Sequence, residues 1–262
     1  MDRRIKTGEL TRMGLLIALA VVLSRFNANN PATGSSTRFG YSFIVFLSGL
    51  WFGPLKGGIV GIVSNLLSFF LFDASTGPFH PGFTLNAFLA GFLPGLYFHG
   101  LRHHPIRRDF TAPTFLFLIL AYSASVLYVW QVRAYAGWLK TALSVFAFLT
   151  AAGLFFFLRS NREKIRLPKG APFSFDKILF IGFVYKFINS VLLAPLWLSQ
   201  LFGKTYNFYF PIRLVKFPFE ALLVSITAYA IQSRIGYEPD RIRNDSTPLF
   251  KDSHIFKKCQ KP

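Results

Sequence analysis

Cationic side chains collect at one end of the predicted apolar segments, where carboxylates are scarce. The set consists of Arg25, Arg38, His80, Arg213 and Lys216. Asp73 is the one carboxylate that we place among the same helix ends. Because a guanidinium can hold a carboxylate through two hydrogen bonds, uncompensated cations at helix ends favour an anionic ligand. Arg25 and Arg213 are therefore the leading candidates for binding such a ligand.

Aromatic residues accompany these cations in the sequence. Phe83 and Trp197 are the candidate stacking surfaces, and Thr84 belongs to the same candidate set. Flat faces beside guanidinium groups suit a flat heteroaromatic acid. Aromatic residues and arginine also favour the headgroup level of a bilayer. Anchoring at the membrane interface is therefore the alternative interpretation of each single aromatic residue.

Two opposite charges lie inside predicted apolar segments rather than at their ends. The helical rise places Lys186 about 12 Å inward from the start of its helix. Glu220 lies about 16 Å from the opposite end of the last helix on the same basis. These depths nearly match, so we predict an ion pair between Lys186 and Glu220, which Asn189 joins from one turn away. Such a pair can fix packing or line a binding site.

The chain lacks the sequence patterns of several enzyme classes. It has no G-x-x-x-x-G-K-[ST] phosphate loop, no H-E-x-x-H and no G-x-S-x-G. Carboxylates are too scarce in the apolar segments for a metal–diphosphate site. Cys259 is the single cysteine, so no internal disulfide can form. We therefore predict no catalytic residue, no metal and no cofactor.

The composition is that of a membrane protein. Of the 262 residues 52% are hydrophobic and 15% are charged, and the mean hydropathy is +0.42. The Lys and Arg residues behind the net charge of +18 flank the apolar segments, where they orient helices rather than bind nucleic acid. Eight candidate spans cover residues 10–26, 41–52, 57–72, 81–98, 114–132, 138–158, 178–198 and 211–231.

The positions of the positive charges predict the orientation. With both termini in the cytosol, most of the 29 Lys and Arg residues fall on the cytosolic side of these eight spans. Cytosolic loops of membrane proteins carry this excess. The sequence therefore predicts an even number of spans and a multi-pass protein of the cell membrane.

Small residues recur at a spacing of four in several of these segments. A strip of this kind allows close approach of another helix. Gly57 with Gly61, and Ala87 with Gly91 and Gly95, are expected to pack within the chain. The strip on the first segment is a candidate surface for docking a separate membrane subunit, and it consists of Gly14, Ala18, Ala20 and Ser24.

The chain resembles the substrate-binding S components of energy-coupling factor (ECF) vitamin importers, in particular the folate type. The matching stretches are Leu-Ser-Arg-Phe at residues 23–26, Phe52-Gly53-Pro54 followed by Gly57-Gly58, Pro81-Gly82-Phe83-Thr84-Leu85 followed by Ala87, Gly91 and Pro94-Gly95-Leu96, and Leu196-Trp197-Leu198-Ser199 followed by Arg213, Lys216 and Pro218. They lie within residues 10–100 and 177–231.

The resemblance implies an all-helical bundle of six helices that binds a vitamin at the outer face of a bacterial membrane. It also implies partners, namely a membrane coupling subunit and two cytosolic ATPases. The pocket arginines of the family would map to Arg25 and Arg213. Residues 101–176 depart from the family pattern and are expected to form an inserted helical hairpin. Residues 232–262 would form a basic cytosolic tail of the single domain 1–262.

Two other functions compete with this expectation. A stand-alone secondary transporter of an organic anion would need a coupling-ion site, for which Lys186 and Glu220 are the candidates. An intramembrane enzyme acting on lipids would need carboxylate clusters that the sequence lacks.

Overall fold

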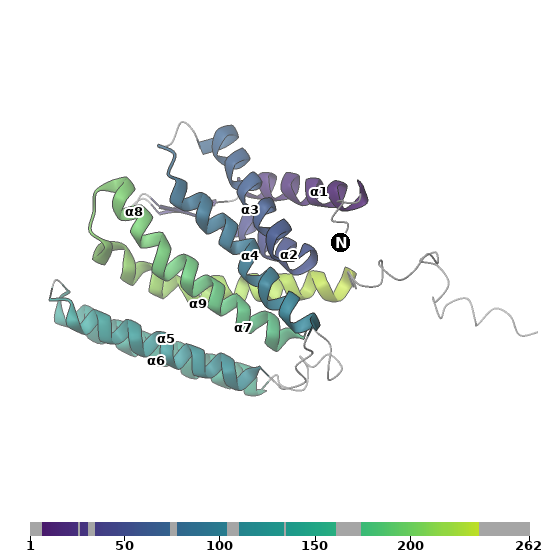
Figure 1. The fold of residues 1–262 in the computed structure, drawn as a ribbon. Helices are drawn as coiled ribbons and strands as arrows, with labels where there is room; N and C mark the ends of the chain where they lie inside the picture. The colour runs from purple at the N-terminus through teal and green to yellow at the C-terminus, as the bar shows by residue number, and fades with distance from the viewer. Residues whose placement is uncertain are drawn as a thin grey trace, which may run out of the picture.

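A computed structural model describes residues 7–25, 27–30, 35–73, 78–103, 110–133, 135–160 and 174–235. Helices make up nearly all of these residues (Figure 1). The first half of the chain contains α1 (Thr7–Leu23), α2 (Phe39–Phe52), α3 (Pro54–Ser68), the π-helix η1 (Phe69–Asp73) and α4 (Pro81–His103). The second half contains α5 (Thr111–Gln131), α6 (Gly137–Ser160), α7 (Phe175–Lys186), the π-helix η2 (Phe187–Leu193), α8 (Ala194–Phe202) and α9 (Tyr206–Ile235).

Glycine and proline mark several helix boundaries. Gly53 takes the left-handed φ of 85° that ends α2, and Pro54 opens α3 at a position that needs no N–H donor. Gly203 ends α8 with a φ of 68°. Pro81 begins α4. These signals explain why the predicted segments agree with the observed helices to within a few residues.

A short antiparallel ribbon was not predicted. The strands β1 (Asn27–Asn30) and β2 (Ser35–Arg38) connect α1 with α2 and pair in a register that sets Asn27 opposite Arg38. Asn, Ser and Thr in this segment show no alternation of apolar and polar residues, so no strand pattern was visible. The fold is otherwise all-α in the described ranges.

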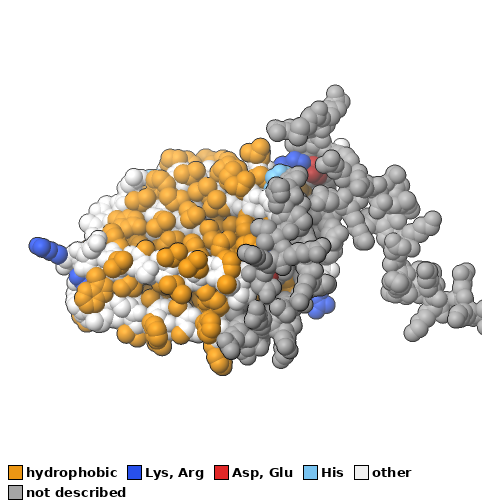
Figure 2. Space-filling view, turned by 60° about the horizontal axis from the view of Figure 1, so that its bottom comes forward, with side chains coloured by type: hydrophobic (Ala, Val, Ile, Leu, Met, Phe, Trp, Pro, Cys, Tyr) orange, Lys and Arg blue, Asp and Glu red, His pale blue; other side chains and the backbone are white. Residues whose placement is uncertain are grey.

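Among the residues that the structure describes, five helices are long and apolar enough to cross a membrane. They span Pro54–Phe72, Thr111–Gln131, Gly137–Phe156, Phe175–Phe202 and Tyr206–Arg234, and Gly40–Phe52 is a shorter apolar helix. Hydrophobic side chains cover much of the face seen in Figure 2, and Lys and Arg lie toward its ends. Exposed Leu, Ile, Val and Phe side chains suit a lipid environment. The total of eight spans stays a prediction.

Three helices pack through their backbones. A Cβ atom on Gly49 of α2 would overlap the carbonyl oxygen of Gly91 on α4, and a Cβ on Gly91 would overlap the carbonyl oxygen of Gly57 on α3. A Cβ on Gly61 would likewise overlap the Ala87 carbonyl. The prediction that these small-residue strips pack within the chain is confirmed, and α2, α3 and α4 form one close-packed unit.

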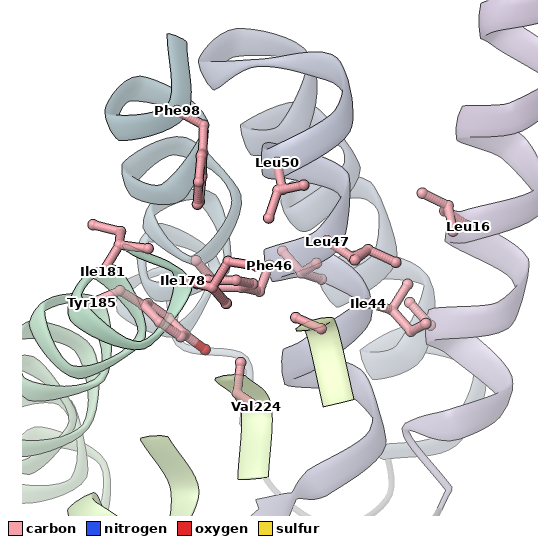
Figure 3. Packing of buried hydrophobic residues seen from close by; sticks show 14 of the residues in the cluster. Leu16, Ile44, Phe46, Leu47, Leu50, Phe98, Ile178, Ile181, Tyr185 and Val224 are labelled. Atoms are coloured by element: carbon pink, nitrogen blue, oxygen red, sulfur yellow. The ribbon is translucent and has the colours of Figure 1, made fainter. Parts of the chain in front are cut away.

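The buried core joins this unit to the second half of the chain. Phe46 and Leu50 of α2, Ile178 of α7 and Val224 of α9 belong to one hydrophobic cluster (Figure 3). A second cluster joins α5 and α6 to α7 and α9, with Phe183 and Phe217 fully buried in it. Helices α5 and α6 run side by side along the lower side of Figure 1. They therefore form a helical hairpin packed against α7 and α9.

Candidate functional site

The π-helix η2 carries several polar side chains of the site. Pro195 has no N–H, so it cannot donate to the Val191 carbonyl four residues earlier. The hydroxyl of Tyr206 donates to that carbonyl instead, at 3.4 Å. A π-turn widens a helix and recurs at functional sites. Here it turns Asn189 and Ser190 into the protein interior, where both are buried.

The predicted ion pair between Lys186 and Glu220 is confirmed. Lys186 Nζ lies 3.1 Å from Glu220 Oε2, and the two side chains are 8% and 6% exposed. The ammonium also donates to Ser42 Oγ at 3.2 Å. Glu220 Oε1 is buried and accepts no hydrogen bond from a described residue. The pair therefore links α2, α7 and α9 and leaves one buried acceptor oxygen unused.

Two further cations lie on α9 on the same side as Glu220. Arg213, Lys216 and Glu220 are spaced by three and four residues, which places them on one face of a helix. Arg213 and Lys216 are partly buried and act electrostatically on Glu220, as does Lys186. Within this group of four described side chains, three cations act on one carboxylate, so the group itself carries a net positive charge.

An amide cluster connects η2 with α4. Asn86 and Asn189 each donate to the main-chain carbonyl of the other, at 3.3 Å and 2.7 Å. Trp197 Nε1 donates to Asn86 Oδ1 at 3.1 Å, which fixes the orientation of the Asn86 amide. Asn189 Oδ1 is buried without a hydrogen-bond partner among the described residues. The cluster places an indole ring beside a second unused acceptor.

Trp197 packs directly on the backbone of α4. A Cβ atom on Gly82 would overlap the indole ring, so this close approach requires glycine. The His80 ring lies 5.6 Å from that of Trp197 and 5.9 Å from that of Phe83, between ring centroids. The glycine of the Pro-Gly-Phe-Thr stretch thus leaves room for the Trp197 ring.

His80 has a defined tautomer. Its Nδ1 accepts a hydrogen bond from the Gly82 amide at 3.1 Å, so the proton of the neutral ring lies on Nε2. Nε2 then donates to Gln200 Oε1 at 3.0 Å. Thr84, which follows in α4, accepts from Asn65 Nδ2 at 3.2 Å. The start of α4 is therefore tied to α3 and α8 by side chains.

The structure does not join the two leading arginines. The Arg25 guanidinium lies over the Phe72 ring, 4.5 Å from its centroid, and no contact among the described residues links it to Arg213. Arg38 ends strand β2, and its side chain lies outside the described part of the chain. Lys186, Arg213 and Lys216 come together around Glu220, and His80, Phe83 and Trp197 form a second group. Asn189 does not join the ion pair as predicted, because its amide donates to Asn86 beside Trp197, and Thr84 accepts from Asn65.

The candidate docking strip divides between two faces of α1. Gly14 and Ala18 are exposed, and nothing would touch a Cβ on Gly14 within 4 Å. Ala20 and Ser24 are buried within the chain, at 0% and 5% exposure. A partner helix could therefore contact the first two residues but not the last two in this arrangement.

Several residues of the site were not identified from the sequence. They are Ser42, Asn65, Asn86, Ser190 and Gln200. The available signal was a single polar side chain inside an apolar helix, which Asn65 and Asn86 both show. Polar residues within membrane helices face the interior of a bundle or a functional site.

The comparisons with known proteins agree with the fold. The family model described as "ECF-type riboflavin transporter, S component" matches residues 4–155. The chain belongs to this family of S components. Membership assigns it to transport rather than to enzymatic catalysis, and together with the five long apolar helices it makes the chain a multi-pass membrane protein.

One curated protein and one solved structure are also similar to the chain. The folate transporter FolT of Clostridium novyi (strain NT) is 38% identical over 96 residues, which are 36% of this chain and 52% of the relative. The chain thus spans about half the length of that curated relative. The crystal structure of FolT bound with folic acid is similar with a TM-score of 0.52 and 22% identity, over 88% of this chain and 97% of that chain. This likeness shows a shared fold.

Proposed function

We propose that this S component is the substrate-binding subunit for a folate-type vitamin, with ATP hydrolysed by partner subunits. The observation that carries the proposal is the gathering of Arg213, Lys216 and the Lys186–Glu220 pair at one face of α9, where all three cations act electrostatically on Glu220. Folates carry carboxylates, whereas riboflavin carries none. A group of partly buried cations favours an anionic ligand.

The other half of the site supports recognition of a flat ring. Trp197 and Phe83 supply the aromatic surface, and Asn86, Asn189 and His80 supply amide and imidazole groups beside it. The unused acceptors Asn189 Oδ1 and Glu220 Oε1 suit ligand N–H donors. In this proposal Arg213 and Lys216 hold the carboxylate, and Arg25 and Arg38 attract the anion from the aqueous side.

The partners follow from the family. A membrane coupling subunit would contact the exposed Gly14 and Ala18 strip on α1, because small residues permit close helix contact. Two cytosolic ATPases would supply the energy. Both termini would face the cytosol of a bacterial cell, with the α8–α9 end of the bundle on the outside. The hairpin of residues 101–176 would be an addition to the six-helix core.

The binding proposal is tested by titrating the full chain, purified alone in detergent, with folic acid and with riboflavin while following tryptophan fluorescence. We expect saturable folic acid binding that Arg213→Ala weakens about 10- to 100-fold, because a hydrogen bond to a charged group contributes about 1.5–3 kcal/mol. Arg133→Ala, on an exposed connection of the hairpin, is the matched control and should leave binding unchanged.

Two results would contradict the proposal. One is tight riboflavin binding without folic acid binding, and the other is unchanged folic acid affinity in Arg213→Ala. Folic acid uptake by proteoliposomes that contain this chain alone, without ATPases, would favour a secondary transporter. In that case the buried Lys186–Glu220 pair becomes the candidate coupling site.

A further inference from the structure

The outer tip of the α5–α6 hairpin holds the beginning of α9. Tyr128 of α5 donates its hydroxyl hydrogen to Asn207 Oδ1 at 2.6 Å. Tyr135, in the connection between α5 and α6, donates to the Asn207 main-chain carbonyl at 2.7 Å. One residue of α9 thus receives two short hydrogen bonds from the hairpin.

Aromatic rings reinforce the same contact. The Tyr128 ring meets the Tyr206 ring at 90° and the Phe210 ring at 61°, with ring centroids 6.1 Å and 5.0 Å apart. The hydroxyl of Tyr206 continues the link by donating to the Val191 carbonyl in η2. The hairpin, the first turn of α9 and the π-helix therefore form one connected set of contacts.

The connection held in this way lies between two parts of the candidate site. Trp197 and Gln200 lie on α8, shortly before the connection 203–205, and Arg213 follows Asn207 on α9. Gly203 gives the connection its left-handed turn and has no side chain of its own to hold it. A shift of Asn207 would therefore change the spacing between Trp197 and Arg213.

We propose that Asn207 is a positioning residue for ligand binding, held by Tyr128 and Tyr135 so that the hairpin fixes the α8–α9 connection. The proposal rests on the proposed function, because ligand affinity is one of its two readouts. It assigns the hairpin a role in the binding site through Asn207, which itself is not among the candidate ligand groups.

The protonation state of Tyr135 is compatible with this role. This residue lies between the two apolar spans of the hairpin. Burial, followed by the neighbouring Tyr128 and Tyr206 hydroxyls, raises the pKa of Tyr135 above its ordinary value. Its hydroxyl therefore stays protonated, and able to donate, throughout the physiological pH range.

The test uses the full chain with Tyr128→Phe and Tyr135→Phe combined, which removes two hydroxyls and keeps both rings. We expect amide hydrogen exchange at residues 198–210 to accelerate and folic acid affinity to fall about five- to tenfold, as for the loss of one or two hydrogen bonds. Tyr97→Phe is the matched control, because its buried hydroxyl has no partner among the described residues. It should change neither readout.

A second pair of variants separates positioning from general stability. Asn207→Asp keeps an acceptor for Tyr128 and should retain the wild-type affinity. Asn207→Leu has a similar volume without the side-chain acceptor but keeps the main-chain carbonyl that accepts from Tyr135, so it should lose affinity to the same extent as Tyr128→Phe alone. Adding Asn207→Leu to Tyr128→Phe should cost little more, because both changes remove the same hydrogen bond.

The outcomes are distinct. Unchanged exchange at residues 198–210, or faster exchange with unchanged folic acid affinity, would overturn the inference. If the wild-type chain binds no folic acid, the proposed function fails. Hydrogen exchange at residues 198–210 is then the only readout of the positioning role. Faster exchange in the double variant supports the role, and an unchanged rate rejects it.

Discussion

The two halves of the bundle are packed by different means. In α2, α3 and α4, glycines bring backbones into contact, as at Gly49, Gly57 and Gly91. In α7, η2, α8 and α9, the contacts are made by large aromatic rings and by a buried ion pair. Backbone contacts do not depend on side-chain rotamers, whereas the contacts of the second half do. The candidate site lies where the two kinds of packing meet.

The largest effect should follow from breaking the ion pair of the second half. Lys186→Met leaves Glu220 buried without its cation, and such changes cost about 3–5 kcal/mol. Lys186→Met combined with Glu220→Leu should recover a large part of this loss. Reversible denaturant unfolding in detergent micelles measures both, with Lys204→Met on the exposed α8–α9 connection as control. A single variant as stable as the wild type would refute the importance of the pair.

A smaller loss is expected from one methyl group in the first half. Gly91→Ala would force the Gly57 backbone away, and overpacking costs about 1–3 kcal/mol. The matched control is Gly14→Ala, where nothing lies within 4 Å of the new atom. It should stabilise its helix by up to about 1 kcal/mol. Equal shifts of the unfolding midpoint in the two variants would contradict the backbone packing.

A local effect is expected where the halves meet. Gly82→Ala should displace the Trp197 indole and break its hydrogen bond to Asn86, at about 1 kcal/mol of stability. Folic acid affinity should fall by about tenfold, and the tryptophan emission should shift. Gly100→Ala, in the last turns of the same helix with open space around it, is the control. Wild-type affinity in Gly82→Ala would exclude the stacking role of Trp197.

The smallest effect should come from a surface pair in the first half. Lys56 Nζ contacts Glu9 Oε2 at 2.6 Å, and both side chains are 33% exposed. Exposed pairs contribute about 0.2–1 kcal/mol and weaken with salt. A double-mutant cycle of Lys56→Ala and Glu9→Ala should give a coupling energy in that range. A value near that of the Lys186–Glu220 pair would show that burial is not the deciding factor.

The sequence predicted the helices well because membrane spans are long apolar runs that glycine, proline and charged residues bound. It also predicted the Lys186–Glu220 pair, since opposite charges at matching depth in an apolar bundle are stabilised by pairing with each other. The small-residue strips on α3 and α4 were also predicted, from the spacing of four between their small residues. These features depend on composition and on helical rise, both of which a sequence displays directly.

The remaining features depend on tertiary geometry. The π-helix at Phe187–Leu193 has no sequence pattern of its own, and it contains the buried residues Asn189 and Ser190. The partnership of Asn86 with Trp197 joins residues that are distant in the chain. Arg25 and Arg213 were predicted to lie at helix ends on the same side of the membrane, but the Arg25 guanidinium lies over the Phe72 ring. A position at a helix end predicts the depth of a residue in the membrane, but it does not predict which residues it contacts.

The π-helix has a further consequence for the evolution of the site. A π-turn holds one more residue than the α-turn it replaces, so η2 has the geometry of a single-residue insertion absorbed in place. Deleting one residue there would restore a regular helix and rotate α8 by about 100° relative to α7. The Trp197 ring would then no longer pack on Gly82, while Lys186 would still pair with Glu220. A change of one codon can thus separate ring recognition from charge recognition within the same protein.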